Sequence, residues 1–172
     1  MGDARAFAIE AHKNQMYGDK AYVHHLDDVF SVLELFYKKS IMYGEGDSGD
    51  LFVSAYLHDV VEDTHVTLDE ISNKFGDKVA ALVWAVSDGE GKNRAERKAI
   101  AYKKILAVGD EAISLKLADR IANVRNSKLH HARLYKMYTG EQAGLRDSLY
   151  LVGSSFIVKK MWKHLDGLFE EI

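Results

Sequence analysis

Apolar residues recur every three or four positions along most of the chain, and this spacing is typical of amphipathic helices. No stretch shows the strict alternation of apolar and polar residues that indicates a half-buried strand. The 172 residues include no proline, which fits a fold made mostly of helices. We therefore expect an all-α protein. The apolar stripes consist of Ala4, Phe7, Ala8 and Ala11; Val29, Phe30, Leu33, Phe36 and Tyr37; Val79, Leu82, Val83 and Val86; Ile113, Leu117, Ile121 and Val124; and Ile157, Met161, Leu165 and Leu168.

Several helix ends are marked in the sequence. Thr67-Leu-Asp-Glu70 has the capping-box pattern that starts a helix, and Asp77 after Gly76 is a candidate N-cap for the next one. Clusters of glycine and small polar residues predict breaks between helices, but no linker is long enough to separate two domains. We expect one domain over residues 1–172. The predicted breaks are residues 43–49, 87–93 and 140–144.

The composition excludes several kinds of site and partner. Without cysteine there is no disulfide and no thiolate metal site, so histidine, aspartate and glutamate must supply any metal ligands. The formal net charge of −3 argues against binding to long nucleic acids but leaves room for a small anionic ligand. No apolar run is long enough for a membrane span, and the first residues lack the apolar core of a secretory signal. We expect a cytoplasmic protein.

The segment Tyr56-Leu-His-Asp-Val-Val-Glu-Asp-Thr64 concentrates groups that can bind a metal or transfer protons. On a continuous helix, His58, Asp59, Glu62 and Asp63 share one stripe. The three acids repel one another at these spacings, and the negative end of a helix dipole disfavours them. A bound cation removes both penalties, so we favour a metal site. The alternative is a solvent-exposed acidic face with a stray histidine.

Two other segments can supply further ligands. Asp119 and Asn123 lie four residues apart on one helix face, where small neighbours allow another helix or a ligand to approach closely. The alternative for Asp119 is a simple ion pair with a nearby lysine or arginine. His24 and His25 precede an amphipathic helix, and residue chemistry alone does not choose between them. Either could equally be a packed or capping side chain.

These segments together resemble the HD superfamily of metal-dependent phosphohydrolases. Within that superfamily the pattern is most similar to small alarmone hydrolases, akin to the hydrolase half of the RelA/SpoT proteins. The matching motifs cover about residues 4–127, and the C-terminal helices are expected in residues 128–172. The motifs are Ala11-His12 with Gln15, Tyr22-x-x-His25, Leu57-His-Asp-Val-Val-Glu-Asp-Thr64, Phe75-Gly76 and Lys116-Leu-Ala-Asp-Arg-x-x-Asn123.

The resemblance implies a single-domain HD-type helical bundle with a divalent metal, Mn²⁺ in this branch. It also implies a role for individual residues: His25, His58, Asp59 and Asp119 as metal ligands, Glu62 and Asp63 as the acids that position or deprotonate the attacking water, and Asn123 near the nucleotide. Two positions depart from the family pattern. The stretch 16–21 has one lysine where the family carries a basic run, and Leu26 replaces a common proline.

The implied activity is hydrolysis of a phosphorylated nucleoside. We expect removal of pyrophosphate from guanosine 3′,5′-bis(diphosphate), ppGpp, with phosphate contacts from a basic run that could equally be an exposed helix start. One alternative is an HD nucleotide or dinucleotide phosphatase with another substrate. A second alternative is a non-catalytic module that binds nucleotide. The basic run is Arg94, Arg97 and Lys98, and the histidines expected to be structural or superficial are His12, His65, His130, His131 and His164.

Overall fold

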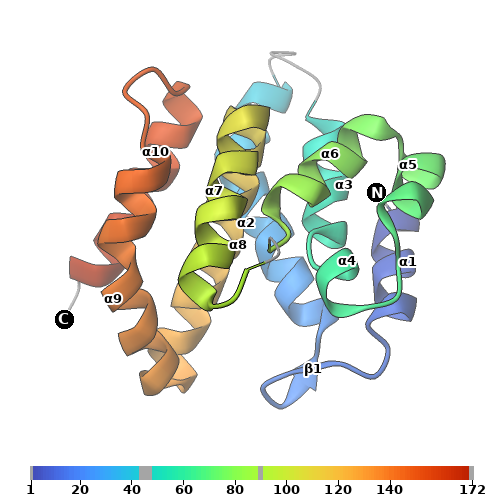
Figure 1. The fold of residues 1–172 in the computed structure, drawn as a ribbon, viewed down its shortest axis with the longest axis horizontal. Helices are drawn as coiled ribbons and strands as arrows, with labels where there is room; N and C mark the ends of the chain where they lie inside the picture. The colour runs from blue at the N-terminus through green and yellow to red at the C-terminus, as the bar shows by residue number, and fades with distance from the viewer. Residues whose placement is uncertain (1, 43–47, 89–90, 171–172) are drawn as a thin grey trace.

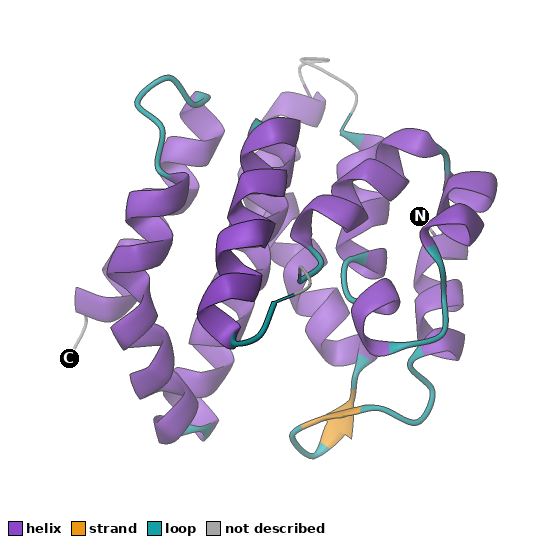
Figure 2. Ribbon diagram, viewed as in Figure 1, coloured by secondary structure: helices purple, strands orange, loops and turns teal. Residues whose placement is uncertain are grey.

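The structure is a computed structural model that describes residues 2–42, 48–88 and 91–170 of the chain. It confirms the predicted all-α fold, with one small antiparallel hairpin in addition (Figure 2). None of the described helices is long and apolar enough to cross a membrane. The elements are α1 (Gly2–Ala11), β1 (Met16–Tyr17), β2 (Lys20–Ala21), α2 (Val23–Met42), α3 (Gly49–Leu57), α4 (Val60–Asp63), α5 (Leu68–Phe75), α6 (Asp77–Val86), α7 (Arg94–Val108), α8 (Asp110–His130), α9 (Ala132–Leu149) and α10 (Phe156–Glu170).

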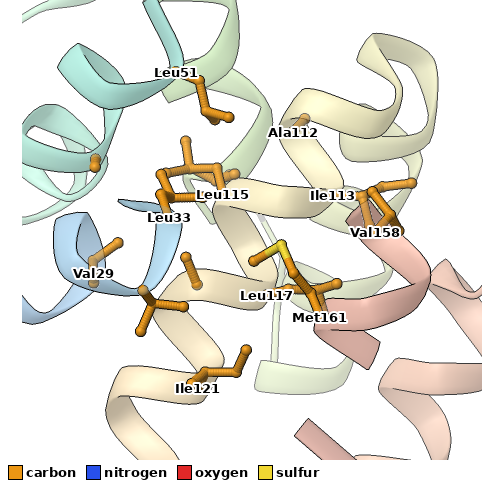
Figure 3. Close-up of a cluster of buried hydrophobic side chains, with 14 of the residues drawn as sticks. Val29, Leu33, Leu51, Ala112, Ile113, Leu115, Leu117, Ile121, Val158 and Met161 are labelled. Carbon is orange, nitrogen blue, oxygen red and sulfur yellow. The ribbon is translucent and has the colours of Figure 1, made fainter. Parts of the chain in front are cut away.

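Helix α8 is the centre of the bundle. It packs against α2, α6 and α7 and also against the C-terminal helices α9 and α10. Helices α9 and α10 lie at one side of the molecule, and α1 and α5 lie at the other (Figure 1). Its apolar side chains meet Val29 and Leu33 of α2 on one side and Val158 and Met161 of α10 on the other (Figure 3). Because α8 is surrounded, polar groups on it are held in fixed positions.

The buried residues form two hydrophobic clusters. The larger one surrounds α8, and the smaller one joins α1 to α3, α5 and α6. Helix α2 contributes to both, since Leu26 packs in the smaller cluster and Val29 in the larger. Replacing a fully buried leucine of this kind by alanine costs about 2–5 kcal/mol in protein cores. The two clusters therefore hold α2, α3 and α8 rigidly where they meet.

The predicted helix starts are partly confirmed. Thr67 and Glu70 form the complete capping box that begins α5. The prediction that Asp77 is an N-cap is wrong, because Asp77 is already the first residue of α6 and Gly76 precedes it as the cap. Gly76 ends α5 and starts α6 with a φ of +96°, a conformation that glycine adopts without strain. The Asp77 carboxylate instead accepts a hydrogen bond from Ser72.

The predicted breaks have different outcomes. The break at 87–93 falls between the end of α6 and the start of α7, although residues 89 and 90 lie outside the described part of the chain. Most of the break at 43–49 also lies outside it. The break at 140–144 is wrong, because α9 runs through it without interruption. Each glycine in a helix costs about 1 kcal/mol relative to alanine, and burial of Leu145 and Leu149 in the larger cluster offsets this cost.

Candidate metal centre

A turn at His58 and Asp59 separates α3 from α4. The prediction of one continuous helix over residues 56–64 is therefore wrong. Asp59 has φ −103° and ψ −5°, away from the helical values of about −63° and about −42°. On a regular helix successive side chains point about 100° apart. The turn brings them together instead, so that His58 Nε2 lies 3.0 Å from Asp59 Oδ2.

Three side chains from distant parts of the sequence converge at this turn. One donor atom each from His25, His58 and Asp119 lies within 4.8 Å of the others. His25 Nε2 is 3.5 Å from Asp119 Oδ1 and 3.6 Å from Asp59 Oδ2. Both imidazoles are buried, with 2% of each side chain exposed. Helix α2, the turn after α3 and helix α8 supply these residues, and the two hydrophobic clusters hold these segments together.

The hydrogen bonds of His58 leave one nitrogen without a partner. Its Nδ1 lies 2.9 Å from the carbonyl oxygen of Ala55, which can only accept, so Nδ1 donates. The opposite nitrogen, Nε2, is buried and faces the carboxylates, and it has no hydrogen-bond partner among the described residues. A histidine metal ligand is typically oriented by a donated bond from its other nitrogen. The cluster therefore fits a divalent cation, which is the partner that Nε2 lacks.

The cluster also attracts positive charge. Burial raises the pKa of both carboxyls, but the two imidazoles outweigh it at Asp59, and Lys116 together with the imidazoles outweighs it at Asp119, so both pKa values lie below the usual range. Burial lowers the pKa of His58, and the two carboxylates outweigh it and raise that pKa to about 9. Both carboxylates are thus ionised at neutral pH, as metal ligands must be.

Neighbouring polar groups orient the two carboxylates. The Tyr22 hydroxyl donates a hydrogen bond to Asp59, and the Asn123 amide donates one to Asp119. Lys116 Nζ is 3.1 Å from Asp119 Oδ2, so the ion pair considered as an alternative for Asp119 exists alongside its contact with the imidazoles. Tyr17 donates to Asn123 over 2.9 Å. Tyr22, Asn123 and Lys116 therefore fix the directions of the Asp59 and Asp119 carboxylates.

A cavity of about 210 Å³ opens beside the cluster, with walls of opposite charge. We call its two groups of charged lining residues the acidic wall (Asp59, Glu62, Asp63, Asp88 and Asp119, together with the His25 imidazole) and the cationic wall (Arg94, Lys98, Lys116 and Arg120).

On the acidic wall, different segments of the chain hold the two acids that follow the turn. Glu62 accepts a hydrogen bond from the backbone N–H of Asp88 over 3.0 Å. Asp63 accepts one from the Gln15 side chain over 2.7 Å. Partial burial of the carboxyl raises the pKa of Glu62; the hydrogen bond from the Asp88 backbone and the charge of Lys116 oppose this rise, while the negative charges of Asp88 and Asp59 add to it. Glu62 thus combines a fixed position with a raised proton affinity, as a proton acceptor requires.

The cationic wall is organised by one carboxylate from α9. Glu141 lies 3.0 Å from Arg94 and 3.1 Å from Arg120, and it also pairs with Lys98. Burial raises the pKa of Glu141, but the three cations outweigh it and lower the value to about 2. Arg97 does not line the cavity and instead pairs with Asp88 over 3.3 Å. Three cations therefore share one carboxylate, which leaves capacity to bind an anion.

Comparison with known proteins assigns the family. The sequence profile described as "HD domain" matches residues 4–140. The chain belongs to the HD-domain family. This assignment confirms the resemblance and the predicted HD-type helical fold.

The relatives of this HD-domain protein include alarmone hydrolases. It is 33% identical over 122 residues to "Guanosine-3′,5′-bis(diphosphate) 3′-pyrophosphohydrolase MESH1" of Danio rerio, covering 70% of this chain and 64% of that protein. It is 35% identical over 127 residues to guanosine-3′,5′-bis(diphosphate) 3′-pyrophosphohydrolase of Aquifex aeolicus, covering 71% of this chain and 17% of that protein. The chain thus spans less than two thirds of the length of these two relatives.

Solved structures share the fold. One, described as "A metazoan ortholog of SpoT hydrolyzes ppGpp and plays a role in starvation responses", has a TM-score of 0.75 at 23% identity and covers 99% of this chain and 96% of its own. Another, lmo0812 from Listeria monocytogenes EGD-e, has a TM-score of 0.65 at 22% identity and covers 86% of this chain and 97% of its own. At these identities the likeness concerns the fold alone.

The histidines of this HD-domain protein fall into different environments. His25 lies in the cluster, whereas the exposed His24 lines a separate cavity of about 410 Å³ together with His130 and His131. His65 is exposed, and His164 lies 2.7 Å from Arg125. His12 is buried and lies 2.7 Å from the Gln15 side chain.

Some polar groups around the site were not expected from the sequence. Tyr22 and Gln15 belong to motifs that the family resemblance quotes, so the motif spacing was a usable signal for them. Arg120 also stands in a quoted motif, beside Asp119. Glu141 carries no such signal, because its partners lie 47, 43 and 21 residues away in the chain.

Proposed function

We propose that this HD-domain protein is a metal-dependent phosphohydrolase acting on a phosphorylated nucleoside. The observation that carries the proposal is the convergence of His25 Nε2, His58 Nε2 and an Asp119 oxygen beside a cavity with a cationic wall. Metal ligands next to cations form the arrangement that phosphoryl chemistry needs, since the negative charge of the phosphate must be both bound and polarised.

The residues that would hold the metal are His25, His58, Asp59 and Asp119. Two imidazoles and two carboxylates suit Mn²⁺, and the same donors accept other divalent first-row metals. When bound there, a divalent cation supplies Lewis acidity toward a phosphoryl oxygen and makes a water more acidic. Asp59 joins the set because its Oδ2 lies 3.0 Å and 3.6 Å from the two imidazole nitrogens.

The acids and cations of the cavity would perform the remaining steps. Glu62, with Asp63 beside it, accepts the proton of the attacking water or orients that water toward phosphorus. Arg94 and Lys98 bind the phosphoryl oxygens with charge-assisted hydrogen bonds. Asn123, which donates to Asp119, lies close to the nucleotide in this proposal. Arg97 acts only indirectly, since it pairs with Asp88.

The substrate that we favour is ppGpp, which is a 3′-pyrophosphorylated GDP, or the corresponding 3′-pyrophosphorylated GTP. Water adds to the 3′-linked phosphorus, the bond to the ribose 3′-oxygen breaks, and the products are pyrophosphate and GDP or GTP. The names of the relatives from Danio rerio and Aquifex aeolicus support this choice. A small-molecule nucleotide is thus the expected partner. A cytoplasmic location stays a prediction.

One observation favours the alternative, a phosphatase with a different nucleotide or dinucleotide substrate. The hairpin segment 16–21 contains a single cation, Lys20, and this residue lines the cavity beside His24 rather than the one beside the metal cluster. Recognition of a guanine nucleotide therefore has fewer cations available at the hairpin than the family pattern provides.

A product-resolved assay separates these functions. Purified protein loaded with Mn²⁺ is incubated with ppGpp and, separately, with a panel of nucleoside monophosphates and dinucleotides. Pyrophosphate released from ppGpp supports the favoured substrate, and orthophosphate released from the monophosphates supports the alternative. Nucleotide binding without turnover, unchanged by Glu62→Gln, would support a non-catalytic binding module and contradict both hydrolase proposals.

A further inference from the structure

Gln15 is tied to the fold by its main chain. It lies between α1 and β1, where its backbone N–H donates to the His12 carbonyl over 2.8 Å and its carbonyl accepts from the Tyr22 N–H over 3.1 Å. The backbone N–H and the backbone carbonyl of Gln15 are therefore both held by hydrogen bonds. The side chain extends from this anchored position toward the acidic wall of the cavity.

The Gln15 side chain connects a buried imidazole to a carboxylate of the cavity. Its Oε1 lies 2.7 Å from His12 Nδ1, and its Nε2 lies 2.7 Å from Asp63 Oδ2. An ionised carboxylate only accepts hydrogen bonds, so the amide NH₂ must face Asp63. The amide oxygen then faces His12, whose Nδ1 must be the donor. The Asp63 carboxylate thus determines the amide orientation of Gln15 and the protonated nitrogen of His12.

The imidazole at the far end of this connection cannot move freely. His12 is 4% exposed, and its ring packs on Tyr22 with 4.6 Å between ring centroids. Tyr22 in turn donates to Asp59, one of the proposed metal ligands. Because His12 is buried and stacked, it holds the Gln15 amide at a defined distance from the metal cluster.

Like its neighbour Glu62, which is also exposed, Asp63 needs a partner that holds its carboxylate in place. It is the last residue of the single-turn helix α4 and is exposed, so its own helix does little to restrict the carboxylate. Fixing an exposed side chain costs rotamer entropy unless a partner holds it. Glu62 obtains its restraint from the Asp88 backbone, whereas Asp63 receives the bond from Gln15.

We infer that Gln15, held by His12, is a positioning residue that aims the Asp63 carboxylate at the attacking water. The inference rests on the proposed function, because it assumes that Asp63 assists Glu62 during hydrolysis. Within the described residues, the side-chain hydrogen bonds of Gln15 go to His12 and Asp63 and not to the metal ligands or the proposed phosphate contacts. Its loss should therefore lower kcat and leave both KM and the affinity for Mn²⁺ unchanged.

The kinetic test compares Gln15→Ala with a control two residues away. Misplacing a catalytic group by about 1 Å can cost about 100-fold in rate, so we expect kcat to fall about 10- to 100-fold. Lys13→Ala removes an exposed side chain that forms an ion pair with Glu10 at the surface, and kcat should not change. His12→Asn, which keeps a donor near the position of Nδ1, should retain more activity than His12→Leu.

Two results separate positioning from a merely structural role. In an Asp63→Ala background, Gln15→Ala should cause no further loss of kcat, because the carboxylate that it aims is gone. A structural role would instead give additive losses together with a lower melting temperature and weaker Mn²⁺ binding. Wild-type kcat in Gln15→Ala, or full additivity with Asp63→Ala, would overturn the inference.

An NMR measurement tests the connection without relying on activity. The side-chain amide protons of Gln15 should exchange slowly with solvent and lose this protection in Asp63→Ala and in His12→Leu. Unprotected amide protons in the wild-type protein would overturn the inference and leave the proposed function intact. Protected amide protons in a protein that hydrolyses no nucleotide would refute the proposed function, and Gln15 would then hold Asp63 without serving hydrolysis.

Discussion

The acidic and cationic walls of the cavity differ in how their charge is balanced. The cationic wall carries its own counter-ion, because Arg94, Lys98 and Arg120 converge on Glu141. On the acidic wall Lys116 pairs with Asp119, but the buried Nε2 of His58, which faces the carboxylates, has no hydrogen-bond partner within the described part of the chain. One wall is therefore pre-arranged by an internal anion, while the other is completed by an external cation.

The two walls also differ in how the chain builds them. The acidic wall comes mainly from the turn between α3 and α4 and from α4 itself, to which α2, the segment after α6 and α8 add one residue each. The cationic wall needs α7, α8 and α9 to pack together. A local turn can place catalytic groups precisely relative to one another, whereas the cations depend on long-range packing. Substitutions in each wall should consequently have different effects.

The largest expected effect is that of His25→Ala on the acidic wall. Loss of this ligand should weaken Mn²⁺ binding by more than about 100-fold, since even substitutions behind the ligands cost 10- to 100-fold, and turnover should be almost abolished. Calorimetric titration with Mn²⁺ measures the affinity, and a thermal melt without metal checks the fold. The adjacent but exposed His24 supplies the matched control, so equal losses in His24→Ala would contradict the assignment of His25.

A smaller loss is expected for Glu62→Gln, which keeps the metal site. General-base catalysis contributes about 10²- to 10⁴-fold, so kcat should fall by at least the lower figure while Mn²⁺ still binds. The ionised carboxylate is the active form, and its pKa is raised above the usual 4.5. Wild-type kcat should therefore decrease as the pH is lowered, and the decrease should begin at pH values above 4.5.

The pH profile of the variant provides the check. Gln cannot titrate, so this acidic decrease should be absent from Glu62→Gln if Glu62 causes it. Glu34→Gln, which changes an exposed acid on α2, should keep the wild-type profile. A profile in Glu62→Gln that still falls at the same pH would assign the titration to another group.

On the cationic wall, we expect a substitution to weaken substrate binding more than it slows the chemical step. A hydrogen bond to a charged group contributes about 1.5–3 kcal/mol, so Lys98→Met should raise KM by about 10-fold or more. The metal affinity should not change, because Lys98 pairs with Glu141 and not with the cluster. Steady-state kinetics of Lys98→Met and of Lys103→Met, which lies on the exposed side of α7, make the comparison. Similar KM values in both variants would remove Lys98 from the phosphate contacts.

The smallest expected effect is on folding stability and concerns Glu141→Gln. The pKa of Glu141 is lowered from 4.5 to about 2, so its ionised form stabilises the folded state at pH values above 4.5. This stabilisation is lost as the pH falls from 4.5 toward 2. The wild-type protein should exceed the variant in its free energy of unfolding at pH 7, and the difference should shrink at pH 3.

Urea unfolding at the two pH values measures this difference. Asp147→Asn on the same helix, α9, is the control, since Asp147 is exposed. A difference between wild type and Glu141→Gln that stays constant from pH 7 to pH 3 would show that Glu141 does not stabilise the cationic wall through its charge.

The sequence predicted the acidic wall better than the cationic one, for a physical reason. The histidines and acids of the metal cluster and of α4 stand in short motifs whose spacing can be recognised in the sequence. The turn at His58 and Asp59 was missed, because helical periodicity does not reveal a local change in backbone angles. Glu141 was missed because its role depends on α9 packing beside α7.

The errors in the fold have a similar origin. Glycine favours a break locally, but α9 continues through Gly140 and Gly144 because the helix buries Leu145 and Leu149 against its neighbours. Tertiary burial overrides local preference at such positions. Predictions that depended on apolar spacing succeeded, since that spacing reflects the buried face of the helix itself.

The central claim is that one divalent cation binds between α2, the turn after α3, and α8. Anomalous diffraction from crystals soaked in Mn²⁺ tests it most directly. The account predicts one strong peak within bonding distance of His25 Nε2, His58 Nε2 and an Asp119 carboxylate oxygen. A peak elsewhere in the molecule, or none at a Mn²⁺ concentration that supports turnover, would contradict it.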